Sequence, residues 1–120
     1  MDTISKILVA LVAIEHVYIL VLEMFLWTAP RTRKTFGTTE TFAKESKALA
    51  ANQGLYNGFL AAGLFWSLVN PTAAFAHQLQ IFFLVCVIVA AIYGGMTAKR
   101  SILYVQGLPA LIALIAVLAS

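Results

Sequence analysis

Charged side chains and cysteine are scarce in this sequence. Of its 120 residues, 11% are Asp, Glu, Lys or Arg, and one residue is cysteine. Soluble domains carry about one quarter charged residues, and a lone cysteine cannot form an internal disulfide. The sequence also lacks a glycine-rich phosphate loop, a nucleophile elbow and a Cys-x-x-Cys pair. These absences argue against a soluble domain and against enzymes that depend on those motifs.

Apolar residues, by contrast, make up 62% of the chain and gather in long runs. A membrane-spanning helix needs about 20 such residues, because each residue advances the helix by about 1.5 Å across roughly 30 Å of hydrocarbon. The sequence therefore predicts an all-α membrane protein in which residues 1–120 form a single domain. We expect an antiparallel bundle of four transmembrane helices, at about residues 4–28, 48–69, 78–98 and 101–119.

Basic residues are concentrated in two of the three connections between these runs. The loop 29–47 and the turn at Lys99 and Arg100 together hold seven of the eight Lys and Arg residues. Positive residues favour the cytoplasmic side, so we expect both connections there and both termini outside. The basic cytoplasmic loop 29–47 carries Phe36 and Phe42 between its cations. We expect it to lie on lipid headgroups and not to bind nucleic acid.

Small residues and a proline predict how the helices pack. Glycine or alanine recurs every fourth residue in the second run, which lets another helix approach closely. Pro109 interrupts the fourth run and cannot donate a hydrogen bond to the carbonyl of Val105. A kink or a freed carbonyl is therefore expected near Pro109. The small residues of the second run are Ala50, Gly54, Gly58 and Ala62.

Three ionisable residues interrupt the first run, namely Glu15, His16 and Glu23. A charged side chain at the bilayer centre costs roughly 3 kcal/mol, so such residues face a protein interior, a wet cavity or a partner. At about 100° per residue the three share one face of a helix. We predict that Glu15, His16 and Glu23 exchange protons, as catalytic or coupling residues.

Amides and phenols in the other runs complete a predicted polar column. One polar side chain from each helix lies about five residues from its cytoplasmic end, namely Glu23, Gln53, Tyr93 and Gln106. The outer half, at residues 7–13, 60–65, 81–85 and 111–118, is apolar. Such residues also serve as interhelical hydrogen bonds, each worth roughly 0.6–2 kcal/mol. The residues expected to bind a solute or substrate are Asn52, Gln53, Tyr56, Asn57, Tyr93 and Gln106.

A metal ion and other cofactors are not expected. Two carboxylates and one imidazole are suitable ligand types. However, the neighbours Glu15 and His16 point about 100° apart on a helix, and no second histidine or cysteine from another run joins them.

Four strings in fixed order carry a family resemblance. They are EHVYI with LEMFLW at residues 15–27, ANQGLYNG at 51–58, IYG at 92–94 and QGLPA at 106–110. Over nearly the whole chain the sequence resembles a bacterial family of small membrane proteins known as domain of unknown function thirteen-oh-four. The resemblance implies a four-helix, multi-pass protein of the bacterial inner (cytoplasmic) membrane and supplies no activity.

A second similarity is architectural. The small multidrug resistance exporters also have four helices and an essential carboxylate midway along the first, where Glu15 stands here. They have few other polar groups within the membrane, whereas this chain has Asn52, Gln53, Asn57 and Gln106. The similarity therefore indicates an architecture and no particular cargo.

Three functions fit these patterns, and whether the chain is an enzyme stays open. The favoured hypothesis is a carrier, in which Glu15 exchanges a proton for a small cationic or polar solute. The alternatives are a membrane enzyme that acts on a lipophilic substrate by Glu/His proton transfer, and a structural subunit whose polar groups only join helices. The partners expected are the lipid bilayer, the solute or substrate and, because four helices make a narrow bundle, a second copy in a homodimer.

Overall fold

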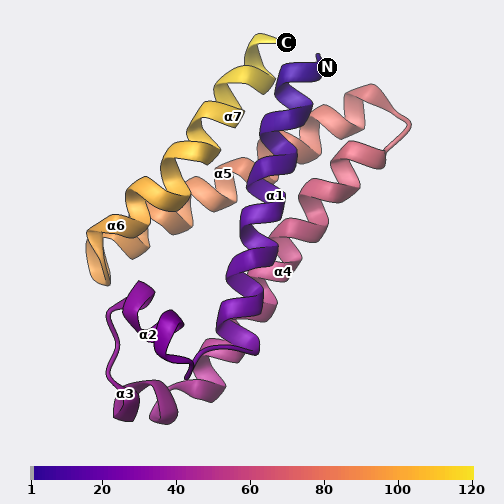
Figure 1. The fold of residues 1–120 in the computed structure, drawn as a ribbon. Helices are drawn as coiled ribbons and strands as arrows, with labels where there is room; N and C mark the ends of the chain where they lie inside the picture. Colours follow the sequence, from indigo (N-terminus) through magenta and orange to yellow (C-terminus); the bar gives the residue numbers. More distant parts are fainter. Residues whose placement is uncertain (1) are drawn as a thin grey trace. The chain divides into compact units, whose positions relative to one another are not determined.

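The computed structural model describes residues 2–120, and these form helices joined by short connections (Figure 1). No strand occurs in this range, so the all-α prediction is confirmed. The elements in chain order are α1 (Thr3–Met24), α2 (Pro30–Phe36), α3 (Glu40–Glu45), α4 (Lys47–Val69), α5 (Ala73–Thr97), α6 (Arg100–Ile102), the π-helix η1 (Leu103–Gly107) and α7 (Leu108–Ala119).

Three helical stretches of residues 2–120 are long and apolar enough to cross a membrane. They are Thr3–Met24, Ala73–Thr97 and Arg100–Ala119, with mean hydropathies of 2.2, 2.3 and 2.3. Helix α4 has 23 residues but is not among them, because strongly hydrophilic amides occupy its first half. The molecule is thus a helical protein with three candidate spans. The fourth span at 48–69 and the outside location of both termini stay predictions.

The end of α1 differs from the prediction. The sequence predicts that the first run is helical to residue 28, but α1 ends at Met24. Pro30 begins α2 at a position where its missing N–H is not needed. The indole Nε1 of Trp27 donates to Ser46 Oγ at 3.0 Å, and its ring centroid lies 5.0 Å from that of Phe36. Trp27 is thereby held in the turn after the helix.

The connection 29–47 forms two short helices. Gly37 ends α2 in the left-handed conformation, at φ 71° and ψ 32°, which glycine adopts without strain. Thr39 begins α3, and its Oγ1 accepts a hydrogen bond from the backbone N–H of Phe42 at 3.1 Å. On α3 the hydrogen bond and charge of Lys44, 3.0 Å away, lower the pKa of the Glu40 carboxyl. These local signals explain helices where a loop was expected.

The chain divides into two compact units. Unit 1 contains Met1–Ile14 and Leu60–Ser120, and unit 2 contains Glu15–Phe59. Unit 1 therefore holds the first half of α1, the last part of α4, and all of α5 to α7. Unit 2 holds the rest of α1 and α4 together with α2 and α3.

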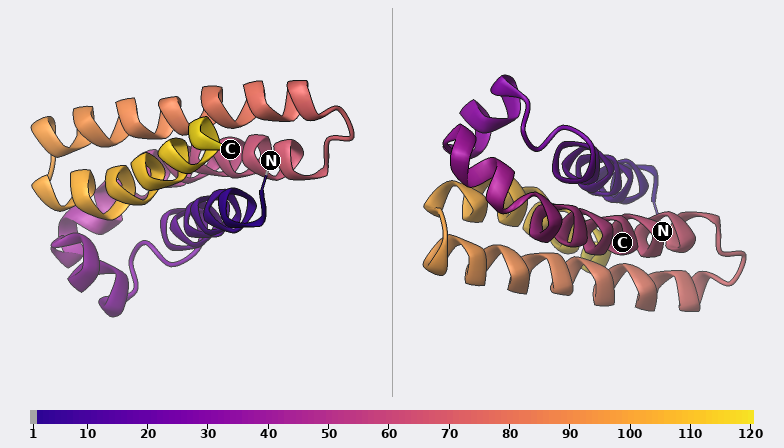
Figure 2. Two further views of the ribbon diagram at one scale, coloured as in Figure 1. Left: turned by 90° about the horizontal axis from the view of Figure 1, so that it is seen from above. Right: turned by 90° about the horizontal axis from the view of Figure 1, so that it is seen from below.

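Unit 1 has an apolar core made by four helices. In this unit α5 and α7 lie side by side after the turn at Lys99 (Figure 2). Gly95 lets the chain return closely, because a Cβ added there would lie 2.8 Å from Leu103 Cβ. The buried core residues are Val9, Val12, Ala13, Leu64, Leu84, Val87, Ala110, Ala113 and Val117.

Near Pro109, where a kink or a freed carbonyl is expected, the structure has a π-helix. The segment before this proline is the π-helix η1, and Pro109 lies in the first turn of α7. Pro109 cannot donate to a carbonyl of the preceding turn, so the wider hydrogen-bonding ring of a π-helix accommodates it. The backbone at Gly107 is buried against Ala91, whose Cβ would lie 3.1 Å from a Cβ on Gly107.

In unit 2, α1 and α4 run antiparallel in close contact. Gly54 packs on Met24 and Glu23, and Gly58 packs on Leu20 one turn earlier in α1. A Cβ on Gly54 would lie 2.7 Å from Met24 Cγ, 3.0 Å from Glu23 Cβ and 3.3 Å from the Leu20 carbonyl oxygen. A Cβ on Gly58 would meet only the flexible tip of Leu20. The small residues thus make a close helix approach here, and it is tightest at Gly54.

Replacing each of these two glycines with alanine should give unequal results. Alanine favours a helix over glycine by roughly 0.5–1 kcal/mol at either position. At Gly54 the new Cβ also overpacks α1, at a cost of about 1–3 kcal/mol. We expect G54A to unfold at a lower SDS fraction than G58A, with circular dichroism of the detergent-solubilised protein as the measurement. Equal stability of the two variants would contradict the close approach at Gly54.

Candidate functional site

The carboxyl of Glu23 lies at the centre of a small polar cluster in unit 2. Its side chain is 2% exposed. Glu23 Oε2 accepts a hydrogen bond from Gln53 Nε2 at 2.9 Å, and Oε1 accepts one from Asn57 Nδ2 at 2.6 Å. Both carboxyl oxygens therefore act as acceptors, which is the pattern of a carboxylate. We call these three residues the Glu23 cluster.

Helix geometry explains why these two amides reach one carboxyl. Gln53 and Asn57 are four residues apart on α4, so their side chains project from one face of the helix, one turn apart. Gly54 lies beside Gln53 and brings the backbone of α4 against Glu23 and Met24 of α1. A residue with a side chain at this position would hold the helices farther apart. The short hydrogen bond to Asn57 depends on that close approach.

The Glu23 cluster contains no cation of its own. The two donors are neutral amides, and no Lys or Arg of residues 2–120 forms an ion pair with Glu23. A buried carboxylate without a counter-charge is costly in a low-dielectric interior. It is neutralised either by a proton or by a positively charged ligand. The cluster is therefore chemically suited to exchange one for the other.

Glu15 and His16, the other two predicted proton-exchange residues, lie nearer the middle of α1. Glu15 is half-buried, and its Oε1 is buried without a hydrogen-bond partner among residues 2–120. His16 is 1% exposed and has an interaction partner. Eight residues of helix, or about 12 Å, separate Glu15 from Glu23 along α1. The amides of Gln53 and Asn57 thus donate hydrogen bonds to Glu23 and not to Glu15.

The remaining predicted binding residues are spread over both units. Asn52 is exposed, and Tyr56 is 60% exposed with its ring 5.7 Å from that of Phe59 in an edge-on contact. Tyr93 of unit 1 is 70% exposed, and Gln106 is half-buried in η1. Of the six predicted residues, the structure brings Gln53 and Asn57 to Glu23.

Gln80 is a buried polar residue without a predicted role. It lies on α5, is 0% exposed, and neither its Nε2 nor its Oε1 has a partner within residues 2–120. It is on the helix face that also buries Ala76, Leu84 and Val87. This spacing is the signal that could have identified it, because a glutamine in register with core residues must be buried.

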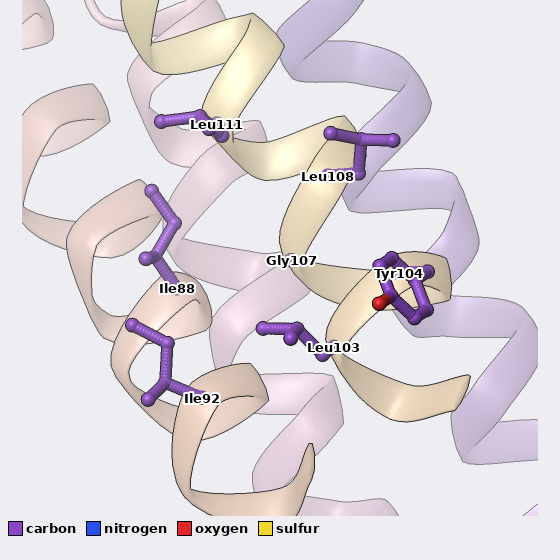
Figure 3. Close-up of a pocket in the computed structure, with 7 residues that line it drawn as sticks. All are labelled: Ile88, Ile92, Leu103, Tyr104, Gly107, Leu108 and Leu111. Carbon is purple, nitrogen blue, oxygen red and sulfur yellow. The ribbon is translucent and has the colours of Figure 1, made fainter. Parts of the chain in front are cut away.

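An apolar pocket of about 210 Å³ lies in unit 1 where α5, η1 and α7 meet (Figure 3). Its lining has no carboxyl, imidazole or amide side chain, and the hydroxyl of Tyr104 is its one polar side-chain group. It is therefore suited to hydrocarbon and offers no proton-transfer group. The lining residues are Ile88, Ile92, Leu103, Tyr104, Gly107, Leu108 and Leu111. Among the described residues no group of three or more His, Cys, Asp and Glu is arranged to hold a metal ion.

Three apolar helices and buried polar groups within them define a helical membrane protein. The chain belongs to the family described as Protein of unknown function (DUF1304), whose sequence profile matches residues 10–118. It is similar to the uncharacterized protein YpaA of Lactococcus lactis subsp. lactis (strain IL1403), with 35% identity over 119 residues, 96% of this chain and 97% of the relative. The expected family is thus confirmed. No solved structure matches the chain, and the similarity to small multidrug resistance exporters is not confirmed.

Proposed function

We propose that the protein is a carrier that exchanges protons for a small cationic or polar solute at the Glu23 cluster. The observation that carries this proposal is the burial of Glu23 between two neutral amide donors with no Lys or Arg paired to it. Residues that carry charge within a membrane span are functional by default, since their insertion is unfavourable. This proposal assigns the proton exchange to Glu23, which lies about two helical turns nearer the end of α1 than Glu15.

The chemistry follows from the three side chains. With a proton bound, the Glu23 carboxyl is neutral, and its burial is then far less costly than that of a charged carboxylate. When a cation arrives, the proton leaves and the carboxylate holds the cation by charge. Gln53 and Asn57 donate to the carboxylate oxygens in this form. Each amide also has a carbonyl oxygen that can accept a hydrogen bond from an ammonium or guanidinium group.

Topology and assembly complete the proposal. The basic connections 29–47 and 99–100 would lie on the cytoplasmic side of a bacterial inner membrane, with α4 as a fourth span and both termini outside. A homodimer would supply more helices around the solute than one narrow chain can. The exposed basic residues of α2 and α3 would then lie at the anionic headgroups.

The apolar pocket favours a second candidate, an enzyme that acts on a lipophilic substrate. Its hydrocarbon lining would hold the apolar part of such a molecule, with Tyr104 toward the polar part. However, proton transfer needs an acid or base within hydrogen-bond reach, and the lining contains none apart from this phenol. The pocket therefore supports lipid binding more directly than catalysis.

Cation-induced proton release tests the carrier proposal. Purified protein in detergent and weak buffer is mixed with ethylammonium, guanidinium, tetramethylammonium or potassium ions, and a pH indicator reports the released protons. We expect at least one of these cations to release up to one proton per chain, and saturably. E45Q, which removes an exposed acid on α3, is the control and should release the same amount. If no cation releases protons, or if E45Q also loses the release, the proposal is overturned.

A further inference from the structure

The unpaired amide of Gln80 is energetically unusual. Both polar atoms of its side chain are buried and lack a partner among the described residues, 2–120. Leaving a buried polar group unpaired costs about 1–3 kcal/mol, and the great majority of buried polar groups are therefore hydrogen-bonded. An isosteric apolar residue would remove this cost. The retained amide indicates that Gln80 pairs with something in another state of the protein.

Two more buried polar residues lie toward the same end of unit 1. Ser5 is 0% exposed in the first turn of α1, and Ser67 is 1% exposed near the end of α4. Their hydroxyls donate to carbonyl oxygens three residues earlier in the chain, that of Asp2 just before α1 and that of Leu64 in α4. Each hydroxyl oxygen can still accept a hydrogen bond.

The helix ends define where these residues lie. The start of α1, the end of α7 and the turn between α4 and α5 are at one end of unit 1 (Figure 1). We call this the terminal end. Gln80 is seven residues, or about 10 Å, beyond the start of α5. One turn farther along α5, Leu84 belongs to the apolar core. Buried polar residues, among apolar ones such as Ala76 and Val117, therefore extend from the terminal end to the level of Gln80, and the buried residues of α5 beyond Gln80 are apolar.

We propose that the terminal end of unit 1 is a water-access path, closed in this structure, that opens to hydrate Gln80. Separation of the helix ends would let water satisfy both atoms of the amide and reach the hydroxyls of Ser5 and Ser67. Among the described residues of unit 1, the buried polar ones are Ser5, Ser67 and Gln80, so no further buried polar side chain beyond Leu84 on α5 would draw water deeper. The path would open on the side of the membrane that the charge distribution predicts to be outside. The entry of water along this path does not depend on the proposed carrier function. A role of the path in passing a solute does rest on that function.

Thiol labelling measures this access directly. Cys86 is the only cysteine, so C86S provides a background without thiols. In this background Q80C is compared with L84C, which replaces another 0% exposed residue one turn deeper on α5. The proteins are reconstituted in liposomes and treated on both sides with a charged, membrane-impermeant methanethiosulfonate. We expect Q80C to react at least about tenfold faster than L84C. Water in the path would allow the thiol at position 80 to ionise, and the thiolate is the form that reacts.

The second variant, S67C, exchanges one oxygen for sulfur and should also react faster than L84C. Equal rates for Q80C and L84C overturn the proposal, and so does labelling of S67C alone. If Q80C does not fold, as judged by size-exclusion chromatography, equal rates for S67C and L84C overturn it.

The labelling does not involve Glu23. Fast labelling of Q80C together with absent proton release in the wild type would overturn the carrier function and leave the water path standing, and the reverse result would overturn only the path.

Discussion

Replacing Glu23 with glutamine should abolish proton-driven solute uptake. Glutamine has nearly the volume of glutamate and can still accept one amide hydrogen bond through its carbonyl oxygen, so the E23Q protein should fold. It cannot release a proton or carry the negative charge that holds a cation. We expect uptake into proteoliposomes driven by a pH gradient to fall at least about 100-fold, equivalent to about 2.7 kcal/mol of lost coupling. The solute for this assay is the cation that releases protons from the wild type.

Glu15 provides the matched comparison for this variant. It is the other acid within α1, but no amide donates to its buried Oε1. We expect E15Q to keep uptake within about fivefold of the wild type, a change of roughly 1 kcal/mol. If E15Q abolishes uptake and E23Q does not, the exchange site lies at mid-helix, as the sequence first suggested. If both variants transport normally, neither acid couples protons to solute.

The second large effect is expected on stability, from replacing Asn57 with leucine. The change removes the 2.6 Å hydrogen bond to Glu23 Oε1 and leaves that buried oxygen without its donor. Loss of a donor to a buried carboxyl costs about 2–3 kcal/mol. The N57L protein should therefore unfold at a distinctly lower SDS fraction than the wild type. N52L is the control, because Asn52 is an exposed amide on the same helix, and it should change stability little.

A double-mutant cycle separates the contact from general effects of each substitution. E23L removes the carboxyl, so in the E23L background N57L should cost less than in the wild type. We expect a coupling free energy of about 1.5 kcal/mol, near the upper end for hydrogen bonds between membrane helices, because the acceptor is a carboxyl group. Additive effects in the cycle would contradict the contact between Glu23 and Asn57.

Much of the architecture follows from composition and periodicity. The long apolar runs predicted helices, and these agree to within five residues at each end with α1, α4, α5 and the combined stretch of α6, η1 and α7. Pro109 predicts a kink or a freed carbonyl, and the structure has the π-helix η1 shortly before it. The helices α2 and α3 were not predicted, because cap signals such as Gly37 and Thr39 are local and weaker than an overall polar composition. The division into two units has no sequence signature, since it falls within continuous helices.

For the site, the sequence by itself determined that acids and amides must lie within apolar helices, and that Glu23 and Gln53 belong at a similar depth. Helical periodicity assigns residues to a face but not the rotation of that face toward a neighbour. Only the tertiary structure decided that Gln53 and Asn57 both donate to Glu23, that Tyr56 and Tyr93 point away from their own units, and that Gln80 is buried without a partner. The physical reason is that side-chain hydrogen bonds form only over about 3 Å. Whether two side chains come that close depends on how closely glycines such as Gly54 let two helices approach.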